Sequence, residues 1–388
     1  MPSLRLPTFL AGALVALAAG CDGSSDSTPG GQGDVGDAGG GVDTGAPGPD
    51  AGAGNADSGA QGDSGMKPPM NDGGASDGAG PDAPPSPRDE LLGFIRQISG
   101  SKTMSGEQNR EAAVGDFIAA MHTATGHYPA LWGGDFLYES DAIANRGNVI
   151  QYLMNGWKKG AVISLMYHAC PPTQSEACGW DGGVKSSLSD AQWSDLVTDG
   201  GSLNQVWKSR LDAIAPYFAQ LKAAGMAALF RPHHEMNQGV FWWGGRKGPN
   251  GTAKLFQITH DYLVNTKGLD NIVWVWSVQD IWDNGTNSWN FDAYNPGAAY
   301  WDVMSLDFYD GAGYTTDKYN AMLAVAGSKP IAIGECQVIP TPAELRAQPR
   351  WTYFMGWAEL VQQNESDAQI KATYTAPNVL TQDSMPGW

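Results

Sequence analysis

The chain has 388 residues, a formal net charge of −18 and a pI near 4.5. An acidic chain of this kind repels the phosphates of nucleic acids, so we expect no nucleic-acid partner. Hydrophobic residues make up 42% of the chain and include 15 Trp, which excludes a chain that is disordered throughout.

Residues 1–21 predict an export signal. Arg5 supplies a positive start, and residues 9–19 form an apolar run that is too short for a transmembrane helix. The four residues that end at Cys21 resemble a bacterial lipobox, in which the cysteine carries the lipid, although Leu17 lies one position earlier than usual. We therefore expect a lipoprotein held at the cell surface or outer membrane through Cys21, and simple secretion is the alternative.

Residues 22–88 predict a disordered linker. The segment consists mostly of Gly, Ala, Asp, Ser and Pro, so it lacks the apolar side chains that would offset the entropy lost on folding. Eleven Asp against Lys67 and Arg88 place about half of the net charge of the chain here. The remaining residues, 89–388, are enough for one large domain.

From residue 89 onward, short apolar runs alternate with longer amphipathic stretches. The run 161–167 is apolar almost throughout, as expected for a strand that is covered on both faces. Residues 203–224 predict a helix that stops at Gly225. We predict eight strands, at residues 103–105, 130–136, 161–168, 227–233, 272–277, 303–309, 330–335 and 378–382.

Eight strand–helix units of this size predict an α/β fold, a single (β/α)8 TIM barrel. A doubly wound open sheet is the alternative, although no Gly-x-Gly-x-x-Gly motif follows the first strand. Five of the predicted strands end in polar or ionisable residues, and in a barrel such ends open into one mouth, where substrates bind. These ends are Gly-Gly-Asp-Phe at 133–136, Tyr-His at 167–168, Arg-Pro-His-His-Glu at 231–235, Asp-Phe-Tyr at 307–309 and Gly-Glu-Cys-Gln at 334–337.

Glu235 and Glu335 close the fourth and seventh predicted strands. A buried carboxylate is costly unless it is paired, so each one alone fits either a structural ion pair or a functional group. Together they match the two carboxyl groups that cleavage of a glycosidic bond requires, a proton donor and a nucleophile or base. The donor needs a raised pKa, which burial and a neighbouring negative charge provide.

Tryptophans gather near these strand ends, at 241–243, 274–276, 282–289 and 351–357. Exposed indoles stack on the flat apolar faces of sugar rings, so the clusters favour a carbohydrate cleft. Ordinary core packing is the alternative for about half of these side chains, and Trp274 and Trp276, inside a strand, fit it best.

Metal and serine chemistry have little support in the sequence. A zincin helix carries His-Glu-x-x-His, but Gln238 stands four residues after His234 and the run follows a strand, so we expect no metal and no cofactor. The only Gly-x-Ser-x-Gly motif lies at 74–78, in the linker. Cys170 and Cys178 are close enough to form a disulfide within one loop, whereas Cys336 fits a buried core position.

Residues 231–237, followed by 241–244, closely resemble the acid/base region of glycoside hydrolase family 26. That family consists mainly of endo-β-1,4-mannanases on a (β/α)8 barrel. Residues 90–388 carry further similar motifs in the same order: Ser-Gly-Glu-Gln at 105–108, Gly-Asp-Phe at 134–136, His168, Asp-Phe-Tyr at 307–309, Ile-Gly-Glu at 333–335 and Trp357. The resemblance implies that Glu235 is the acid/base and Glu335 the nucleophile of a retaining reaction, with their carboxyl groups about 5–5.5 Å apart.

The resemblance also implies the residues that bind the substrate. Tyr309 would hydrogen-bond the nucleophile, and His234 takes the place before the acid/base that many related glycosidases give to Asn. The glycone side of the cleft would be formed by His168, Trp243, Asp307 and Trp357. We expect the substrate to be a β-mannan, galactomannan or glucomannan, the protein to be a monomer, and its membrane contact to be the lipid anchor alone.

The sequence departs from the family pattern just beyond the acid/base. Gln238 replaces a Gly, and Val240 stands where the family has a Trp that helps to hold the leaving-group sugar. The linkage preference therefore stays open, and a β-1,3-xylanase or mixed-linkage β-glucanase of the same family is the first alternative. A non-catalytic surface protein that binds polysaccharide is the alternative of another class; the loss of a catalytic Glu would favour it, and both are present.

Overall fold

The computed structural model describes residues 84–283 and 288–388. The predicted export signal, the lipobox Cys21 and nearly all of the predicted linker lie outside the described residues. None of the helices in the described part of the chain combines the length and the apolar character that a membrane crossing requires.

Eight parallel strands of the described chain close into a barrel. Each strand pairs with the next, and β1 pairs with both β2 and β8, which closes the ring. The strands are β1 (Thr103–Gln108), β2 (Leu131–Asp135), β3 (Val162–Tyr167), β4 (Ala228–Pro232), β5 (Ile272–Gln279), β6 (Val303–Phe308), β7 (Ile331–Cys336) and β8 (Trp351–Gly356). The predicted (β/α)8 barrel is confirmed, and the open sheet is excluded.

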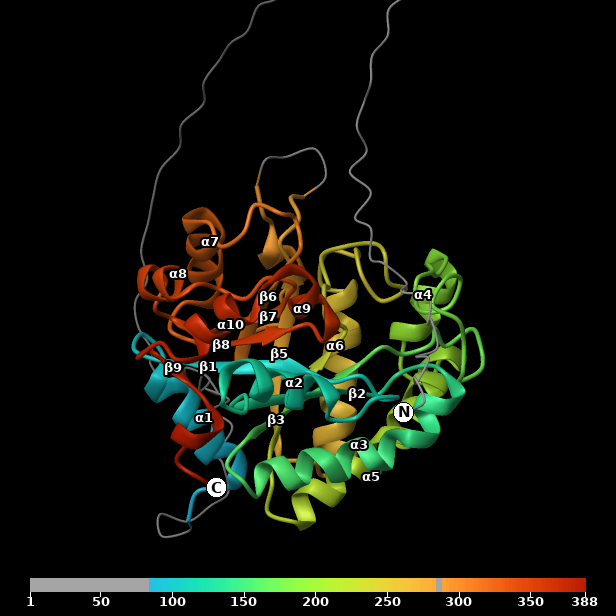
Figure 1. The fold of residues 1–388 in the computed structure, drawn as a ribbon. Coiled ribbons are helices and arrows are strands. Elements are labelled where there is room, and N and C mark those ends of the chain that lie inside the picture. Colours follow the sequence, from blue (N-terminus) through green and yellow to red (C-terminus); the bar gives the residue numbers. More distant parts are fainter. Residues whose placement is uncertain (1–83, 284–287) are drawn as a thin grey trace, which may run out of the picture. The chain divides into compact units, whose positions relative to one another are not determined.

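Helices surround the strands, with α3 and α5 along one side of the barrel and α7 and α8 along another (Figure 1). The α-helices are α1 (Pro87–Ile98), α2 (Asp116–Thr125), α3 (Ser140–Trp157), α4 (Asp190–Val197), α5 (Ser202–Ala223), α6 (Thr252–Asp261), α7 (Thr316–Ala326), α8 (Pro342–Ala347), α9 (Glu359–Asn364) and α10 (Asp367–Tyr374). A π-helical turn, η1 (Tyr262–Thr266), and two 3-10 turns, η2 (Phe291–Tyr294) and η3 (Gln382–Ser384), complete the described helical segments.

The strands are apolar because both of their faces are covered. All eight residues of β5 are buried, and the predicted core positions Trp274 and Trp276 are confirmed. α5 matches the predicted helix 203–224 closely, and Gly225 follows it with a φ of +70°, a conformation that glycine adopts without strain.

The predicted eighth strand at 378–382 is wrong. The strand that closes the barrel is β8, a run of six buried residues whose aromatic character suggested sugar binding; Trp351 in fact lies in the core. The predicted segment contains only the short β9 (Val379–Leu380), which pairs with the start of β1 outside the ring. An apolar run fits a closing strand and an edge strand equally well, so only the pairing distinguishes them.

The folded domain begins slightly before the predicted boundary at residue 89. Ser86 caps α1, and Arg88 lies in its first turn rather than in the linker. The Arg88 guanidinium donates to the Asp302 carboxylate at 2.8 Å and to the Ile272 carbonyl at 2.9 Å, so it joins α1 to β5 and to the segment before β6.

Candidate active site

The two predicted catalytic carboxylates lie at the C-terminal ends of their strands. Glu335 is the fifth residue of β7, and Glu235 follows the end of β4 by three residues. His233 and Glu235 have φ values of +51° and +53°, in the left-handed region that L residues rarely adopt. Such backbone is costly and is held only where surrounding contacts stabilise it, often at functional sites.

Three buried carboxyl groups meet at this end of the barrel. One carboxylate oxygen from each of Glu235, Asp307 and Glu335 lies within 4.8 Å of the others. Arg231, at the end of β4, lies among them: it donates to Asp307 at 2.7 Å and also to Glu335. Its buried positive charge compensates part of the negative charge that the three carboxyl groups would carry.

A break in strand register brings Glu335 to this position. Along β6 and β7, Leu306 is opposite Ile333, but the next residue, Asp307, is opposite Glu335, so Gly334 has no partner. A Cβ at Gly334 would collide with the Asp307 carboxylate. Bulges of this kind redirect side chains next to active sites, and only glycine fits here.

Tyr309 holds the second oxygen of Glu335. Its hydroxyl donates to Glu335 Oε2 at 2.8 Å, and burial together with the nearby carboxylates raises the pKa of this tyrosine well above its usual value. The hydroxyl therefore keeps its proton and its donor role. Asp280, just after β5, accepts the backbone N–H of Tyr309 at 3.0 Å, and the buried Lys318 ammonium donates to Asp280 at 2.8 Å.

The electrostatics separate the two glutamates. Burial raises the pKa of Glu235 well above its usual value, and the charges of Glu335 and Asp307 raise it further, while Arg231 opposes the rise. Glu335 has both oxygens held by donors, whereas Oε2 of Glu235 is buried without a hydrogen-bond partner among the described residues. One carboxyl group is thus suited to carry a proton and the other to carry charge.

His168 and His234 form the wall of the site next to Glu235. Their rings lie 4.3 Å apart between centroids. Asp135, at the end of β2, accepts the backbone N–H of His168 at 3.0 Å and contacts its ring Nδ1, so this nitrogen carries the proton. Burial and the neighbouring His168 lower the pKa of His234 well below its usual value, which keeps that ring neutral.

The two predicted aromatic residues of the cleft differ in position. Trp243 is fully buried and donates its indole N–H to the His234 carbonyl at 2.9 Å, so it supports the wall from behind. Trp357 follows β8, its ring lies 6.2 Å from that of His168, and the Arg110 guanidinium stacks on it at 5.4 Å. A salt bridge from Arg110 to Glu359 at 2.6 Å fixes the guanidinium.

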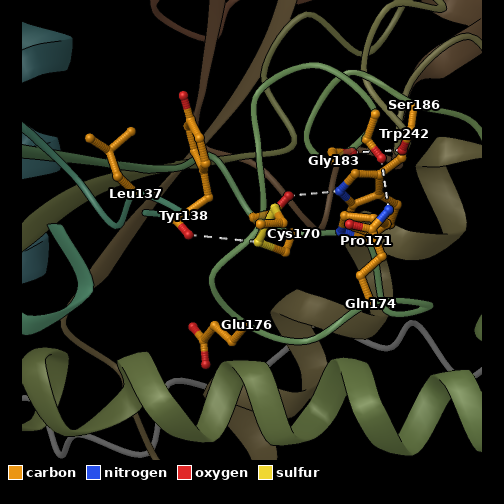
Figure 2. Close-up of a disulfide and its surroundings, with 12 residues drawn as sticks. Leu137, Tyr138, Cys170, Pro171, Gln174, Glu176, Gly183, Ser186 and Trp242 are labelled. Atoms are coloured by element: carbon orange, nitrogen blue, oxygen red, sulfur yellow. Dashed lines mark hydrogen bonds between the residues drawn. A yellow bond between two sulfur atoms is a disulfide. The ribbon is translucent and has the colours of Figure 1, made fainter. Parts of the chain in front are cut away.

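Cys170 and Cys178 form a disulfide in the loop that follows β3. Figure 2 shows this bridge beside Tyr138, whose carbonyl contacts Cys170, and beside Trp242. The Trp242 indole donates to the Ala169 carbonyl at 2.8 Å. The disulfide loop is thereby packed against the segment that follows Glu235. Cys336 is buried and unbridged.

A cluster of three carboxylates also has the composition of a cation site, but here Arg231 pairs with two of them. Its guanidinium occupies one oxygen of Asp307 and one of Glu335, the same acceptors that a cation would need. The residues present fit an arginine-neutralised pair of carboxylates better than a metal centre.

Sequence reasoning missed four residues that organise this site: Asp135, Arg231, Asp280 and Lys318. Asp135 and Arg231 were noted as strand-end residues without a role. Asp280 escaped notice because the predicted fifth strand stopped at Ser277, two residues before β5 ends. Lys318 lies on α7, and no local pattern connects it to Asp280.

The sequence of the chain matches a known protein family. The model described as glycosyl hydrolase family 26 matches residues 82–384. The chain belongs to this family. A mannan endo-1,4-beta-mannosidase from Thermothelomyces thermophilus is 30% identical over 311 residues, which cover 77% of this chain and 61% of that protein. The chain therefore spans about three fifths of the length of that relative.

Solved structures of the family have the same architecture. The GH26A structure from Muricauda sp. MAR_2010_75 superposes with a TM-score of 0.73 at 30% identity and covers 78% of this chain and 98% of that one. A beta-mannanase from a symbiotic protist of the termite Reticulitermes speratus, complexed with gluco-manno-oligosaccharide, gives a TM-score of 0.67 at 27% identity, with 79% and 96% covered.

Proposed function

We propose that this family 26 barrel is a retaining endo-β-1,4-mannanase, with Glu235 as acid/base and Glu335 as nucleophile. The observation that carries the proposal is the pair itself: carboxylate oxygens within 4.8 Å, one group with a raised pKa and the other held by Arg231 and Tyr309. Inverting enzymes separate the two carboxyl groups by about 6.5–9.5 Å to admit a water molecule, and retaining enzymes by about 5–5.5 Å, so oxygens within 4.8 Å support the retaining reaction.

The geometry supports a double displacement. The Glu335 carboxylate attacks the anomeric carbon, the glycosidic C–O bond breaks, and Glu235 gives its proton to the departing oxygen. Glu235, now a carboxylate, then takes a proton from water, whose oxygen attacks the same carbon and releases Glu335. Tyr309 and Arg231 orient the nucleophile in both steps, and the reaction needs no cofactor.

Some of the predicted binding residues are placed to contact the sugar, and others are placed to hold neighbouring side chains. The rings of His168 and Trp357 lie 6.2 Å apart in an edge-to-face arrangement, and both residues fit the predicted glycone side. His234 adjoins them as a neutral ring. Trp243 and Asp307 are fully buried, so their positions favour holding His234 and Arg231 in place over direct contact with sugar.

Azide rescue tests the two catalytic roles. Glu335→Ala should abolish hydrolysis, and azide should restore turnover by attacking from the vacated side to give a glycosyl azide of inverted configuration. Glu235→Ala is the matched control: with an activated aryl glycoside, azide should instead give the azide of retained configuration, because Glu335 still forms the intermediate. Wild-type-like activity of Glu335→Ala, or identical azide products from both variants, would contradict the assignment.

The choice of mannan rests on the relatives named mannan endo-1,4-beta-mannosidase, while Val240 keeps the family's β-1,3-xylanase and mixed-linkage β-glucanase activities as the second candidate. Reducing-sugar release from purified mannan, β-1,3-xylan and lichenan separates them. Turnover of any of the three also excludes a protein that only binds polysaccharide.

Export and anchoring are proposed from the sequence of residues 1–88. A lipid on Cys21, followed by an acidic linker, would hold the enzyme away from the membrane while it reaches polymeric substrate. Labelling with a fatty-acid analogue tests the anchor: incorporation should disappear in Cys21→Ser, and an unlabelled wild-type protein in the culture medium would support simple secretion.

A further inference from the structure

The exposed large apolar side chains of the described chain are concentrated near the site. There are four, and three of them lie in loops that follow the C-terminal ends of strands: Val240 after β4 at 46% exposure, Trp282 after β5 at 54% and Val338 after β7 at 43%. Only Val206, on α5, lies elsewhere. All 15 tryptophans fall in the described residues, and Trp282 is the only one of them that is exposed, since the others are buried or half-buried.

Trp282 lies between two acidic residues that form ion pairs, while its own side chain is open to solvent. Two residues before it, Asp280 is buried and paired with Lys318 at 2.8 Å. One residue after it, Asp283 accepts from Lys247 at 2.5 and 2.7 Å. The backbone on either side of the indole is therefore tied to other segments, which reduces the entropy lost when a ligand stacks on the exposed ring.

The loop that carries Trp282 is joined to the loop of the acid/base. Asn237, two residues after Glu235, donates to the Gln279 carbonyl at 2.8 Å and accepts the Gln279 backbone N–H at 2.7 Å. The contact of Lys247 with Asp283 is a second connection, because Lys247 follows β4 on the same loop as Val240. The exposed Val240 and Trp282 therefore belong to one rim.

The order of strands places this rim opposite the glycone residues. Glu235 follows β4 and Glu335 lies near the end of β7, so the two residues divide the ring of strands into two arcs. His168 and Trp357 lie on the arc that runs through β3 and β8, whereas Trp282 lies on the arc through β5 and β6. Consider a substrate that crosses between the two glutamates with its glycone against His168 and Trp357. The leaving-group part of this bound substrate extends toward Trp282.

We propose that Trp282 is a stacking platform for a sugar ring on the leaving-group side of the cleavage point. The proposal rests on the proposed glycosidase function. Its ligand is a β-linked hexose ring of the polysaccharide that presents an apolar face to the indole. Trp282 thus contributes to binding of the polymer and has no part in bond cleavage.

Two substrates separate binding on the leaving-group side from chemistry. One is mannohexaose; the other is an aryl β-mannobioside, whose leaving group is a phenolate and not a sugar. Trp282→Ala should lower kcat/KM for mannohexaose by roughly five- to tenfold, the range of an aromatic stacking contact, and leave kcat/KM for the aryl substrate unchanged. Trp282→Phe, which keeps an aromatic face, should recover most of the loss.

Val206→Ala is the matched control, since it removes an exposed apolar group from α5 and should leave kcat/KM for both substrates unchanged. An equal loss on both substrates, or no loss on mannohexaose, overturns the proposal. If the wild-type enzyme cleaves neither substrate, the proposed function fails and Trp282 is judged by affinity electrophoresis in gels of galactomannan, xylan or lichenan. Weaker retardation of Trp282→Ala in any of these gels supports the platform, and equal retardation in all of them refutes it.

Discussion

Two buried acidic regions of this barrel differ in the hydrogen-bond partners of their carboxyl groups. At the mouth, Glu335 and Asp307 receive donors from Arg231, and Tyr309 adds a further donor to Glu335. Glu107, on β1, is fully buried, and neither of its oxygens has a hydrogen-bond partner among the described residues. Burial raises the pKa of Glu107 well above its usual value, with contributions from Glu359 and Glu365.

The contrast shows what a reactive carboxylate requires. A buried carboxyl group without partners stays protonated and neutral, because ionisation in an apolar surrounding is costly. A nucleophile must be ionised, and Glu335, the proposed nucleophile, has an arginine and a tyrosine hydroxyl as partners. Glu235 lies between these cases, with a raised pKa that suits a proton donor but with Arg231 limiting the rise.

Removing the arginine should make the mouth resemble the surroundings of Glu107, and this is the largest effect that we expect. Arg231→Met leaves two buried carboxylates without their cation, which should lower the free energy of unfolding by about 3–5 kcal/mol and the activity by about 10²–10³-fold. Since Arg231 lowers the pKa of Glu235, its loss should raise that pKa and move the alkaline limb of the residual activity to higher pH.

Thermal unfolding and a pH–rate profile measure these changes. Lys208→Met is the control, because the Lys208–Asp199 pair lies at the surface, where water and salt screen an ion pair. An Arg231→Met protein with wild-type stability and an unmoved alkaline limb would show that the arginine does not set the charge of this cluster.

Tyr309→Phe tests the second donor and should have an intermediate effect. It removes one hydrogen bond to the charged Glu335, a contact worth about 1.5–3 kcal/mol, and so kcat should fall roughly ten- to a hundredfold. The ring stays in place, so the melting temperature should change little. A kcat within twofold of wild type would mean that Arg231 alone holds the nucleophile.

Glu107→Gln tests the carboxyl group that has no partners, and it should have the smallest effect of these substitutions on stability. The folded-state pKa of Glu107 is raised above the unfolded value, so its contribution to stability is present at acidic pH and is lost as the pH rises through the folded pKa. Gln cannot ionise, so the variant should become more stable than the wild type as the pH rises above the usual pKa of a glutamate. A gain of about 1 kcal/mol in the free energy of unfolding would raise the melting temperature of the variant by roughly 2–4 °C.

Differential scanning calorimetry of both proteins at several pH values measures this gain. Glu90→Gln, on the exposed face of α1, is the control and should follow the wild type at every pH. A constant difference between Glu107→Gln and wild type across the pH range would show that Glu107 does not take up a proton on folding.

Much of the fold was predictable because its signals are local. Seven of the eight barrel strands were placed from apolar runs, and the helix before Gly225 from its amphipathic pattern and its stop. The last strand was misplaced because the run that begins at Trp351 was taken for a sugar-binding cluster. Composition cannot tell an aromatic strand in the core from an aromatic cleft; the burial of Trp351 and its pairing partners can.

The sequence alone placed the two predicted catalytic carboxylates. A glutamate at the end of an apolar strand is positioned by its own strand, and because all barrel strands point the same way, Glu235 and Glu335 had to meet at one mouth. Their partners depend on contacts between distant segments. Arg231 bridges to residues 76 and 104 positions away, and Lys318 on α7 supports Asp280 after β5.

Only the tertiary structure decided which aromatic residues remain available for a ligand. Trp243 and Trp282 look equally suited to sugar binding in the sequence, yet the first is enclosed behind His234 and the second is open to solvent. Exposure is set by everything that packs around a side chain, and no local pattern records it. Proximity along a strand fixed the chemistry of this barrel, whereas packing between strands, helices and loops fixed its charge balance and its open surface.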